Sequence, residues 1–373
     1  MSDKEKVVLY PFDIQSVPLL RHKHLLNNYD IVGAVSPEGW GLCGKDAGLT
    51  DCGNKLGIEV KSSMSEFIEN CDTVFFVDSF YKLDFKNEIY PEMLRCIESN
   101  RNIINLMDIK KEYEEQLKEL CAAANVCYKS FSIKDESRYA AKDEENIVKI
   151  NTPVIFVMGL AERLNKFELQ LALRERLLNL GYKVSQIGSR SHCEIMGFHS
   201  FPEFMYSTTV SEVEKIILFN RLVKQIELIE KPDAIVIGIP GGTMVFNNEY
   251  TNKFGIFAFE ISQAVNPDFV VFSTLYEDFT PEYFKKISNL TKYKFGFDVD
   301  CFNLANTVFD WQKLGSIESD LYLKLSSSFI DEKITNFRNK NIQVYNILND
   351  NDSNMLVENI IEKLSGYGEL DII

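Results

Sequence analysis

Short apolar runs alternate with segments of helical periodicity along the first half of the chain. The runs that predict strands are residues 6–10, 30–35, 58–60, 73–77, 102–106 and 126–131. The segments that predict helices are 16–28, 64–69, 89–99 and 110–124. Strands and helices that alternate this regularly are typical of a doubly wound parallel sheet. We therefore expect a Rossmann-like domain over residues 1–148.

The second half repeats the alternation after a polar segment, SIKDESRYAAKDEENIVKIN, which has few apolar anchors. Its expected strands are 154–158, 182–187, the run PDAIVIGIPGG, 268–273, 293–302 and 342–347. Its expected helices are 166–180, 210–230, 254–265, 281–290 and 354–364. A charged, weakly apolar segment of this kind predicts a linker, so we place the domain boundary near residue 149. Residues 149–373 are expected to form a second α/β domain with a parallel sheet.

The stretch TPVIFVMGLAERLNKFELQ begins that second domain and predicts a buried strand, a sharp turn and a helix. A P-loop places its phosphate-binding motif, G-x-x-x-x-G-K-[ST], at such a turn. Gly159 opens the turn, but Leu164 or Asn165 stands where the second glycine belongs. Lys166 comes one residue late, and Phe167 replaces the hydroxyl residue that would reach magnesium. The sequence therefore predicts a degenerate P-loop domain.

The same turn is our candidate cofactor site. A helix that starts after a buried strand favours anions through its free N–H groups and its dipole, so Asn165 and Lys166 are expected to bind one. Gly159, Gly241 and Gly242 are assigned to this site because glycine lets the backbone approach a ligand closely. For Gly241 and Gly242 the alternative is a close approach to the neighbouring helix. The ligand is unknown, and a nucleotide or a CoA-type donor fits the motif. The alternative for Lys166 is a solvated helix residue.

The strand that ends in GIPGG carries no carboxylate to hold magnesium or its waters. Together with Phe167, this argues against ATP hydrolysis.

The first domain lacks a dinucleotide fingerprint, because its first turn reads YPFDIQSVPLL where glycines would admit a pyrophosphate. NAD is therefore not expected there.

Polar and reactive side chains gather after the expected strand 182–187. We assign substrate binding to Gln186, Ser189, Arg190, His192, Ser200 and Glu203. The equal alternative for Arg190 and Glu203 is that they pair with each other across the loop. Cys193 and His199 are candidates, with Lys166, for catalysis, since a thiolate paired with a base can transfer acyl groups. The alternative is a buried thiol beside a structural histidine. The spacing of His192, Cys193 and His199 matches no zinc pattern, so no metal is assigned.

Composition narrows the classes of function. The net charge of −15 and the sequence pI near 4.9 argue against a nucleic-acid surface, which needs clustered Lys and Arg. No apolar run reaches 18 residues and no signal peptide is recognised, so we expect a cytoplasmic protein that does not span a membrane. The eight cysteines form no CxxC pair and are expected to be free thiols. His22 and His24 are expected on a helix surface.

The chain resembles a known group of proteins in the runs PVIFVMGL, KFELQLALRERLLNLGYKVSQIGSRS, PDAIVIGIPGG and QAVNPDFVVFST. Their order is similar to that of a family that pairs a Rossmann-like N-terminal domain with a P-loop C-terminal domain and includes D-amino-acid N-acetyltransferases. GLAERLNKFELQLALRERL and QIGSRSHCEIMGFHSFPEFM look more narrowly like the peptide maturation system proteins of clostridial natural-product clusters. That resemblance covers nearly the whole chain. It implies a role in ribosomal peptide (RiPP) biosynthesis.

Three hypotheses follow for the function. In the first, the protein is an enzyme, a peptide-modifying transferase that uses a nucleotide-like or acyl-CoA donor. In the second, it is a non-catalytic partner that docks the precursor peptide or another maturation protein, as a homo-oligomer or in a hetero-complex. The third is an NTPase with an unusual loop. The altered P-loop favours the second, and the polar segment after strand 182–187 favours the first.

Overall fold

A computed structural model describes residues 4–131, 146–190, 193–245, 251–310 and 322–366. The chain divides into two compact units. The first unit comprises residues 1–134 together with 194–197, and the second comprises 135–193 and 198–373. We expected the boundary near residue 149, and residues 132–145 of that segment lie outside the described part of the chain.

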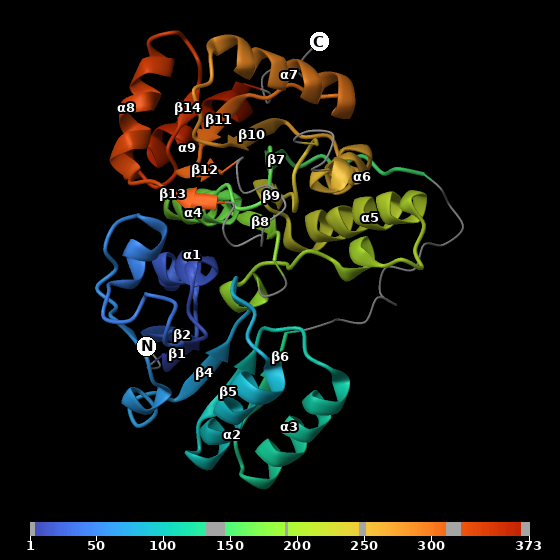
Figure 1. Ribbon diagram of the computed structural model, residues 1–373. Coiled ribbons are helices and arrows are strands. Elements are labelled where there is room, and N and C mark those ends of the chain that lie inside the picture. Colours follow the sequence, from blue (N-terminus) through green and yellow to red (C-terminus); the bar gives the residue numbers. More distant parts are fainter. Residues whose placement is uncertain (1–3, 132–145, 191–192, 246–250, 311–321, 367–373) are drawn as a thin grey trace. The chain divides into compact units, whose positions relative to one another are not determined.

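The first unit contains one six-stranded parallel sheet with the order β3-β2-β1-β4-β5-β6 (Figure 1). Its strands are β1 (Glu5–Tyr10), β2 (Tyr29–Val35), β3 (Val60–Lys61), β4 (Thr73–Phe76), β5 (Asn102–Asn105) and β6 (Tyr128–Ser130). The order reverses between β1 and β4, as it does in dinucleotide-binding folds. The Rossmann-like architecture expected for the first half of the chain is confirmed.

Short and amphipathic helices complete this unit. They are α1 (Val17–Arg21), α2 (Tyr90–Glu98) and α3 (Lys111–Ala123). Met93, Cys96 and Ile97 of α2 and Leu117 and Cys121 of α3 pack against one face of the sheet. These positions recur at helical spacing, and their burial away from water is the main force that holds the helices to the sheet.

The second unit contains another six-stranded parallel sheet, with the order β14-β11-β10-β7-β9-β8. The strands are β7 (Val154–Gly159), β8 (Val184–Ile187), β9 (Ala234–Gly238), β10 (Phe269–Thr274), β11 (Cys301–Leu304) and β14 (Val344–Tyr345). β7 comes first in the sequence among the strands of this sheet but lies between β9 and β10, so the order reverses at β7. Open α/β sheets bind ligands beyond the carboxyl ends of the strands at such a reversal.

Helices cover both faces of the second sheet (Figure 1). One face packs against α4 (Lys166–Asn179) and α9 (Asp350–Gly366). The other face packs against α5 (Glu212–Glu230), α6 (Ile256–Ala264), α7 (Pro281–Phe295) and α8 (Ser327–Arg338). All six residues of β7 are buried, which explains why its sequence is a continuous apolar run.

Several expected elements differ from the structure. The strand expected over 293–302 is wrong in its first part, because α7 continues to Phe295 and Gly296, at a φ of 92°, ends it. The helix expected over 16–28 is reduced to α1 between two 3-10 turns. α8 and an antiparallel hairpin, β12 (Thr307–Phe309) with β13 (Tyr322–Lys324), were not foreseen.

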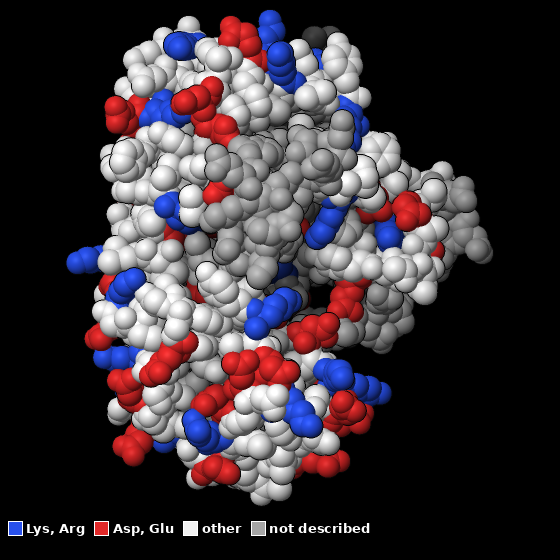
Figure 2. Space-filling model, viewed as in Figure 1, with Lys and Arg blue, Asp and Glu red and all other residues white. Residues whose placement is uncertain are grey.

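All eight cysteines are free, as the sequence predicted, and five of them are buried. Among the described residues, no helix is long and apolar enough to cross a bilayer. Figure 2 shows basic and acidic side chains interspersed over the described surface that faces the viewer. This mixed charge is consistent with the absence of Lys/Arg runs in the sequence.

Candidate anion site at the loop between β7 and α4

The loop between β7 and α4 lies where the strand order of the second sheet reverses, and its backbone is tightly constrained. A Cβ atom added to Gly159 would lie 2.7 Å from the carbonyl oxygen of Ser273 on the neighbouring strand β10. Glycine is therefore required where the chain leaves β7. Arg163 and Asn165 have positive φ angles of 63° and 56°. Asn165 thus takes the left-handed conformation that glycine usually fills, and asparagine tolerates it better than most residues.

Lys166 is the first residue of α4, and its side chain is directed into the protein. The residue is only 7% exposed, and its ammonium donates a hydrogen bond to the carbonyl oxygen of Gly241, beyond the end of β9. Burial lowers the pKa of Lys166 to about 8, although the carboxylate of Glu162 counteracts this and the charge of Lys253 adds to it. A lysine as buried as this one is unlike the solvated helix residue that was our alternative.

Glu162 and Lys253 form an ion pair beside the lysine, with Nζ and Oε1 3.0 Å apart. Burial alone would raise the pKa of the Glu162 carboxyl, but the hydrogen bond and charge of Lys253 lower it overall, with help from Lys166 and Arg163. Glu162 is therefore held in its charged form within the loop. It provides negative charge near the ammonium of Lys166 in the absence of a ligand.

The two glycines assigned to the site lie beyond the end of β9. Gly241 has a φ of 75°, and its carbonyl accepts from Lys166. A Cβ atom on Gly242 would lie 2.0 Å from the Asn252 amide nitrogen and 2.6 Å from the Leu160 carbonyl oxygen. Asn252 itself donates to that carbonyl at 2.7 Å. The segment after β9 is thus packed directly against the loop.

A polar network joins the other side of the loop to the β12–β13 hairpin. The amide of Asn165 donates to Asn306 Oδ1 at 2.9 Å. Lys324 of β13 donates to Asn165 Oδ1 at 2.7 Å, to Thr307 Oγ1 at 2.8 Å and to Asn306 Oδ1 at 3.2 Å. Thr307 in turn donates to the carbonyl of Arg163 at 3.1 Å. Because Asn165 is used in this network, its side chain does not cap α4.

The substrate residues assigned on and after β8 occupy different surroundings. Gln186 is fully buried on β8, and neither its amide nitrogen nor its amide oxygen has a hydrogen-bond partner among the described residues. Ser189 exchanges two hydrogen bonds of 3.2 Å with the amide of Gln170 on α4. Gly238 allows this contact, since a Cβ there would lie 2.0 Å from Gln170 Oε1.

Arg190 lies over the ring of Phe167, with its guanidinium carbon 4.6 Å from the ring centroid. This is a cation–π contact to the residue that replaces the P-loop hydroxyl. Glu203 begins the 3-10 helix Glu203–Tyr206. His192 lies outside the described residues.

Cys193 and His199, the assigned thiol and base, each have partners of their own. Cys193 is fully buried, its Sγ donates to the carbonyl of Arg190 at 3.4 Å, and its N–H donates to Ser200 Oγ at 3.1 Å. His199 Nε2 pairs with the carboxylate of Glu230 at the end of α5.

The carboxylate of Glu230 also accepts from the hydroxyl of Ser185. Burial would raise the pKa of Glu230, but the hydrogen bonds from Ser185 and His199 lower it overall, with the charges of His199 and Arg174 adding to them. This carboxylate therefore orients His199. A carboxylate–imidazole pair of this type can serve a general base or a purely structural purpose.

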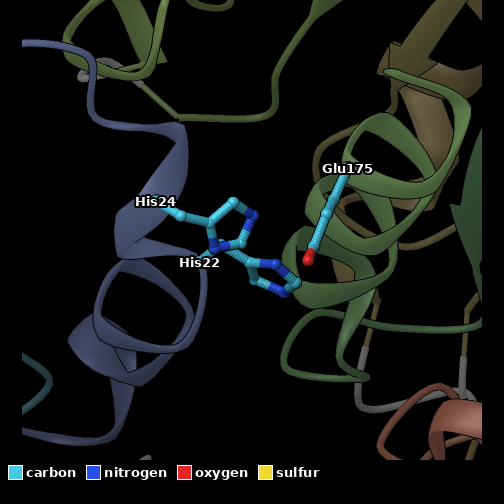
Figure 3. A group of neighbouring side chains, drawn as sticks. All are labelled: His22, His24 and Glu175. Carbon is cyan, nitrogen blue, oxygen red and sulfur yellow. The ribbon is translucent and has the colours of Figure 1, made fainter. Parts of the chain in front are cut away.

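In the first unit, the turn after β1 is organised by a carboxylate in place of glycines. Asp13 Oδ1 accepts from the N–H of Gln15 at 2.8 Å and caps the first helical turn. Figure 3 shows His22 and His24 on the turns that follow. Their ring centroids are 6.0 Å apart; His24 is exposed as expected, but His22 is buried at 4% exposure.

Sequence reasoning missed the residues that surround the loop from elsewhere in the chain. Lys253, Asn306 and Lys324 come from segments about 90 to 160 residues away, so no local pattern could reveal them. Glu162 stands inside the loop itself. A carboxylate within an otherwise P-loop-like turn was the one sequence feature that could have indicated a charged partner for Lys166.

The fold and this loop define a two-domain α/β protein whose second sheet carries a strand–loop–lysine–helix unit at its reversal point. No family model matches the sequence. No curated protein matches it either. The crystal structure of a DUF1611 family protein from Anabaena variabilis is similar in fold, with a TM-score of 0.57, 10% sequence identity, and coverage of 81% of this chain and 88% of that chain.

An amine dehydrogenase from Mycobacterium smegmatis aligns over 50% of this chain and 47% of its own, at 15% identity and a TM-score of 0.26. A score this low supports no common fold. At 10% identity, the similarity to the DUF1611 family protein concerns the fold alone.

Proposed function

We propose that the second unit binds an anionic small molecule, of nucleotide or CoA type, at Gly159, Asn165, Lys166, Gly241 and Gly242. We further propose that the protein uses this site in the maturation of a ribosomally made peptide. The observation that carries the anion site is the burial of Lys166. Within the described part of the chain, its ammonium has one hydrogen-bond acceptor, the carbonyl of Gly241.

A buried ammonium with a single neutral acceptor is costly, because it has left water without a full set of partners. An anion bound at the start of α4 would supply acceptors and opposite charge together. The positive φ of Asn165 favours the same conclusion, since it turns the backbone into the helix at the position where a P-loop has glycine.

The side chains around the loop do not fit magnesium. Phe167 stands where a hydroxyl would coordinate the ion. The hydroxyl of Ser273 donates to the Leu164 carbonyl, and the carboxylate of Glu162 pairs with Lys253. Magnesium prefers free oxygen ligands in octahedral geometry. We therefore assign no metal-dependent step to this site.

The role in peptide maturation rests on the sequence resemblance. A transferase and a non-catalytic partner are both compatible with the anion site. The loss of the magnesium ligands favours a partner whose bound anion regulates docking. The His199–Glu230 pair favours a transferase, because a carboxylate-oriented imidazole is suited to proton transfer.

Native mass spectrometry and thermal-shift measurements with ATP, GTP, CoA and pyrophosphate test the anion site. We expect at least one of these to bind, and binding should be lost in Lys166→Ala. If none binds the folded wild-type protein, the proposed site is wrong.

Pathway output with Lys166→Ala and His199→Ala, measured separately, tests the role in maturation. A transferase should lose output with both variants, whereas a docking partner should retain it with His199→Ala. Unchanged output in a deletion of the whole protein would contradict any role in maturation.

A further inference from the structure

We infer that Lys324 supplies the second positive charge of this site, so that a polyanionic phosphate ligand binds without a metal ion. This inference rests on the proposed anion site and names the chemistry of its ligand. P-loop proteins neutralise phosphate charge with the loop lysine and magnesium together. Here the magnesium ligands are missing, and a lysine from the β12–β13 hairpin lies at the same loop.

The position of Lys324 is the first argument. Its ammonium lies 2.7 Å from the side-chain oxygen of Asn165, the residue immediately before Lys166. The start of a helix carries partial positive charge, so a lysine there is unfavourable unless an anion is also present. The placement of two lysine side chains at one helix start is therefore suited to a ligand with more than one negative charge.

The rigidity of Lys324 is the second argument. Three neutral oxygens, those of Asn165, Asn306 and Thr307, lie within 3.2 Å of its ammonium. Asn306 and Thr307 are fully buried, so these acceptors are fixed in place. A charge that is already oriented can stabilise an anion without the entropic cost of ordering a long side chain.

A second contact fixes the hairpin to the loop. The guanidinium carbon of Arg163 lies 5.0 Å from the ring centroid of Tyr322, two residues before Lys324. The ring of Tyr322 also packs edge-on against Phe309 of β12, with the centroids 5.3 Å apart. The contact of Arg163 with Tyr322 thus adds to the polar network that joins β13 to the loop, and the contact of Tyr322 with Phe309 joins β13 to β12.

Calorimetric titration with pyrophosphate, ATP and CoA, in EDTA and in excess magnesium, tests this inference. We expect wild-type affinity to be unchanged by EDTA. Lys324→Gln retains a hydrogen-bond donor for Asn165 but loses the charge, so affinity should fall about tenfold. Magnesium held by the phosphates of the ligand, and not by protein side chains, should restore part of that loss.

Lys333→Gln is the matched control, because the partners of Lys333 among the described residues are Asp278 and the ring of Tyr276, and neither belongs to the loop. It should leave affinity unchanged. A thermal melt of each variant separates loss of charge from loss of folding.

The outcomes distinguish this inference from the proposed function. Binding that requires magnesium in the wild type, or that is unaffected by Lys324→Gln, overturns the inference while the anion site stands. Lys324→Gln could instead lower both the affinity and the melting temperature, with no recovery of affinity in magnesium. That result would show that Lys324 only stabilises the structure of the loop, and it would also overturn the inference. If the wild type binds none of the three ligands, the anion site fails and the inference fails with it.

Discussion

The ammonium of Lys166 donates a hydrogen bond to the backbone carbonyl of Gly241, which joins the first turn of α4 to the segment beyond β9. The two residues are 75 positions apart in the sequence. Their contact spans the point at which the strand order of the second sheet reverses. A bound anion would compete with the Gly241 carbonyl for the lysine.

Lys166→Met should abolish anion binding and leave the protein as stable as the wild type or more stable. The substitution removes a poorly compensated buried charge and keeps an apolar side chain of similar length, so we expect the free energy of unfolding to rise by about 1 kcal/mol. Urea unfolding and calorimetric titration measure the two effects. Lys215→Met is the control, since Lys215 is 8% exposed and has Glu212 as a partner at 3.9 Å; it should not change anion affinity. A loss of several kcal/mol in Lys166→Met would instead show that the lysine is structural.

Anion affinity should fall as the pH rises through about 8. Burial lowers the pKa of Lys166 from its ordinary value of 10.5 to about 8, so the free protein loses this charge at a lower pH than the unfolded chain does. The unfolded state then binds more protons than the folded state between these values, and stability should rise with pH across that window. Titration calorimetry and urea unfolding on both sides of pH 8 measure the opposed trends. An affinity that stays constant through this window would exclude Lys166 as the ligand's charged partner.

Glu162→Gln and Lys253→Gln should change anion affinity in opposite directions. Glu162 places negative charge beside Lys166, so its neutralisation should strengthen binding about threefold, while Lys253→Gln should weaken it by a similar factor. Both side chains are partly exposed, which keeps the effects small and sensitive to salt. Titrations at low and high salt check this. If the affinity changed in the same direction in both variants, the ion pair would affect binding by holding the conformation of the loop and not by its charges.

Gly159→Ala should destabilise the second unit by about 1–3 kcal/mol, because the added Cβ would lie 2.7 Å from a backbone oxygen of β10 and 3.2 Å from Cδ of Lys166. Gly366→Ala is the control, since a Cβ at the end of α9 meets nothing within 4 Å. The midpoints of urea unfolding compare the two. Equal stability of both variants would mean that β7 shifts to accommodate the methyl group.

The sequence by itself determined the alternation of strands and helices in both halves. Buried parallel strands require unbroken apolar runs, and Val154–Gly159 is such a run in sequence and structure. The sequence also predicted the turn between β7 and α4 and the lysine at the start of the helix, because both features depend only on residues that are neighbours in the chain.

Elements whose sequence pattern is weak were not predicted, or were predicted with the wrong ends. β12 and β13 are three residues each, too short for a periodic pattern to emerge. The end of α7 was set too early, since the apolar residues around Phe295 fit a strand as well as a helix.

Only the tertiary structure decided what surrounds the loop. It buried Lys166 against the carbonyl of Gly241, turned Asn165 toward Asn306 and brought Lys324 to the same position. It also gave His199 a carboxylate partner, Glu230, from the far end of α5. The physical reason is that a parallel sheet gathers the ends of its strands at one edge whatever their order in the chain, so the charges that meet there come from segments that no local pattern connects.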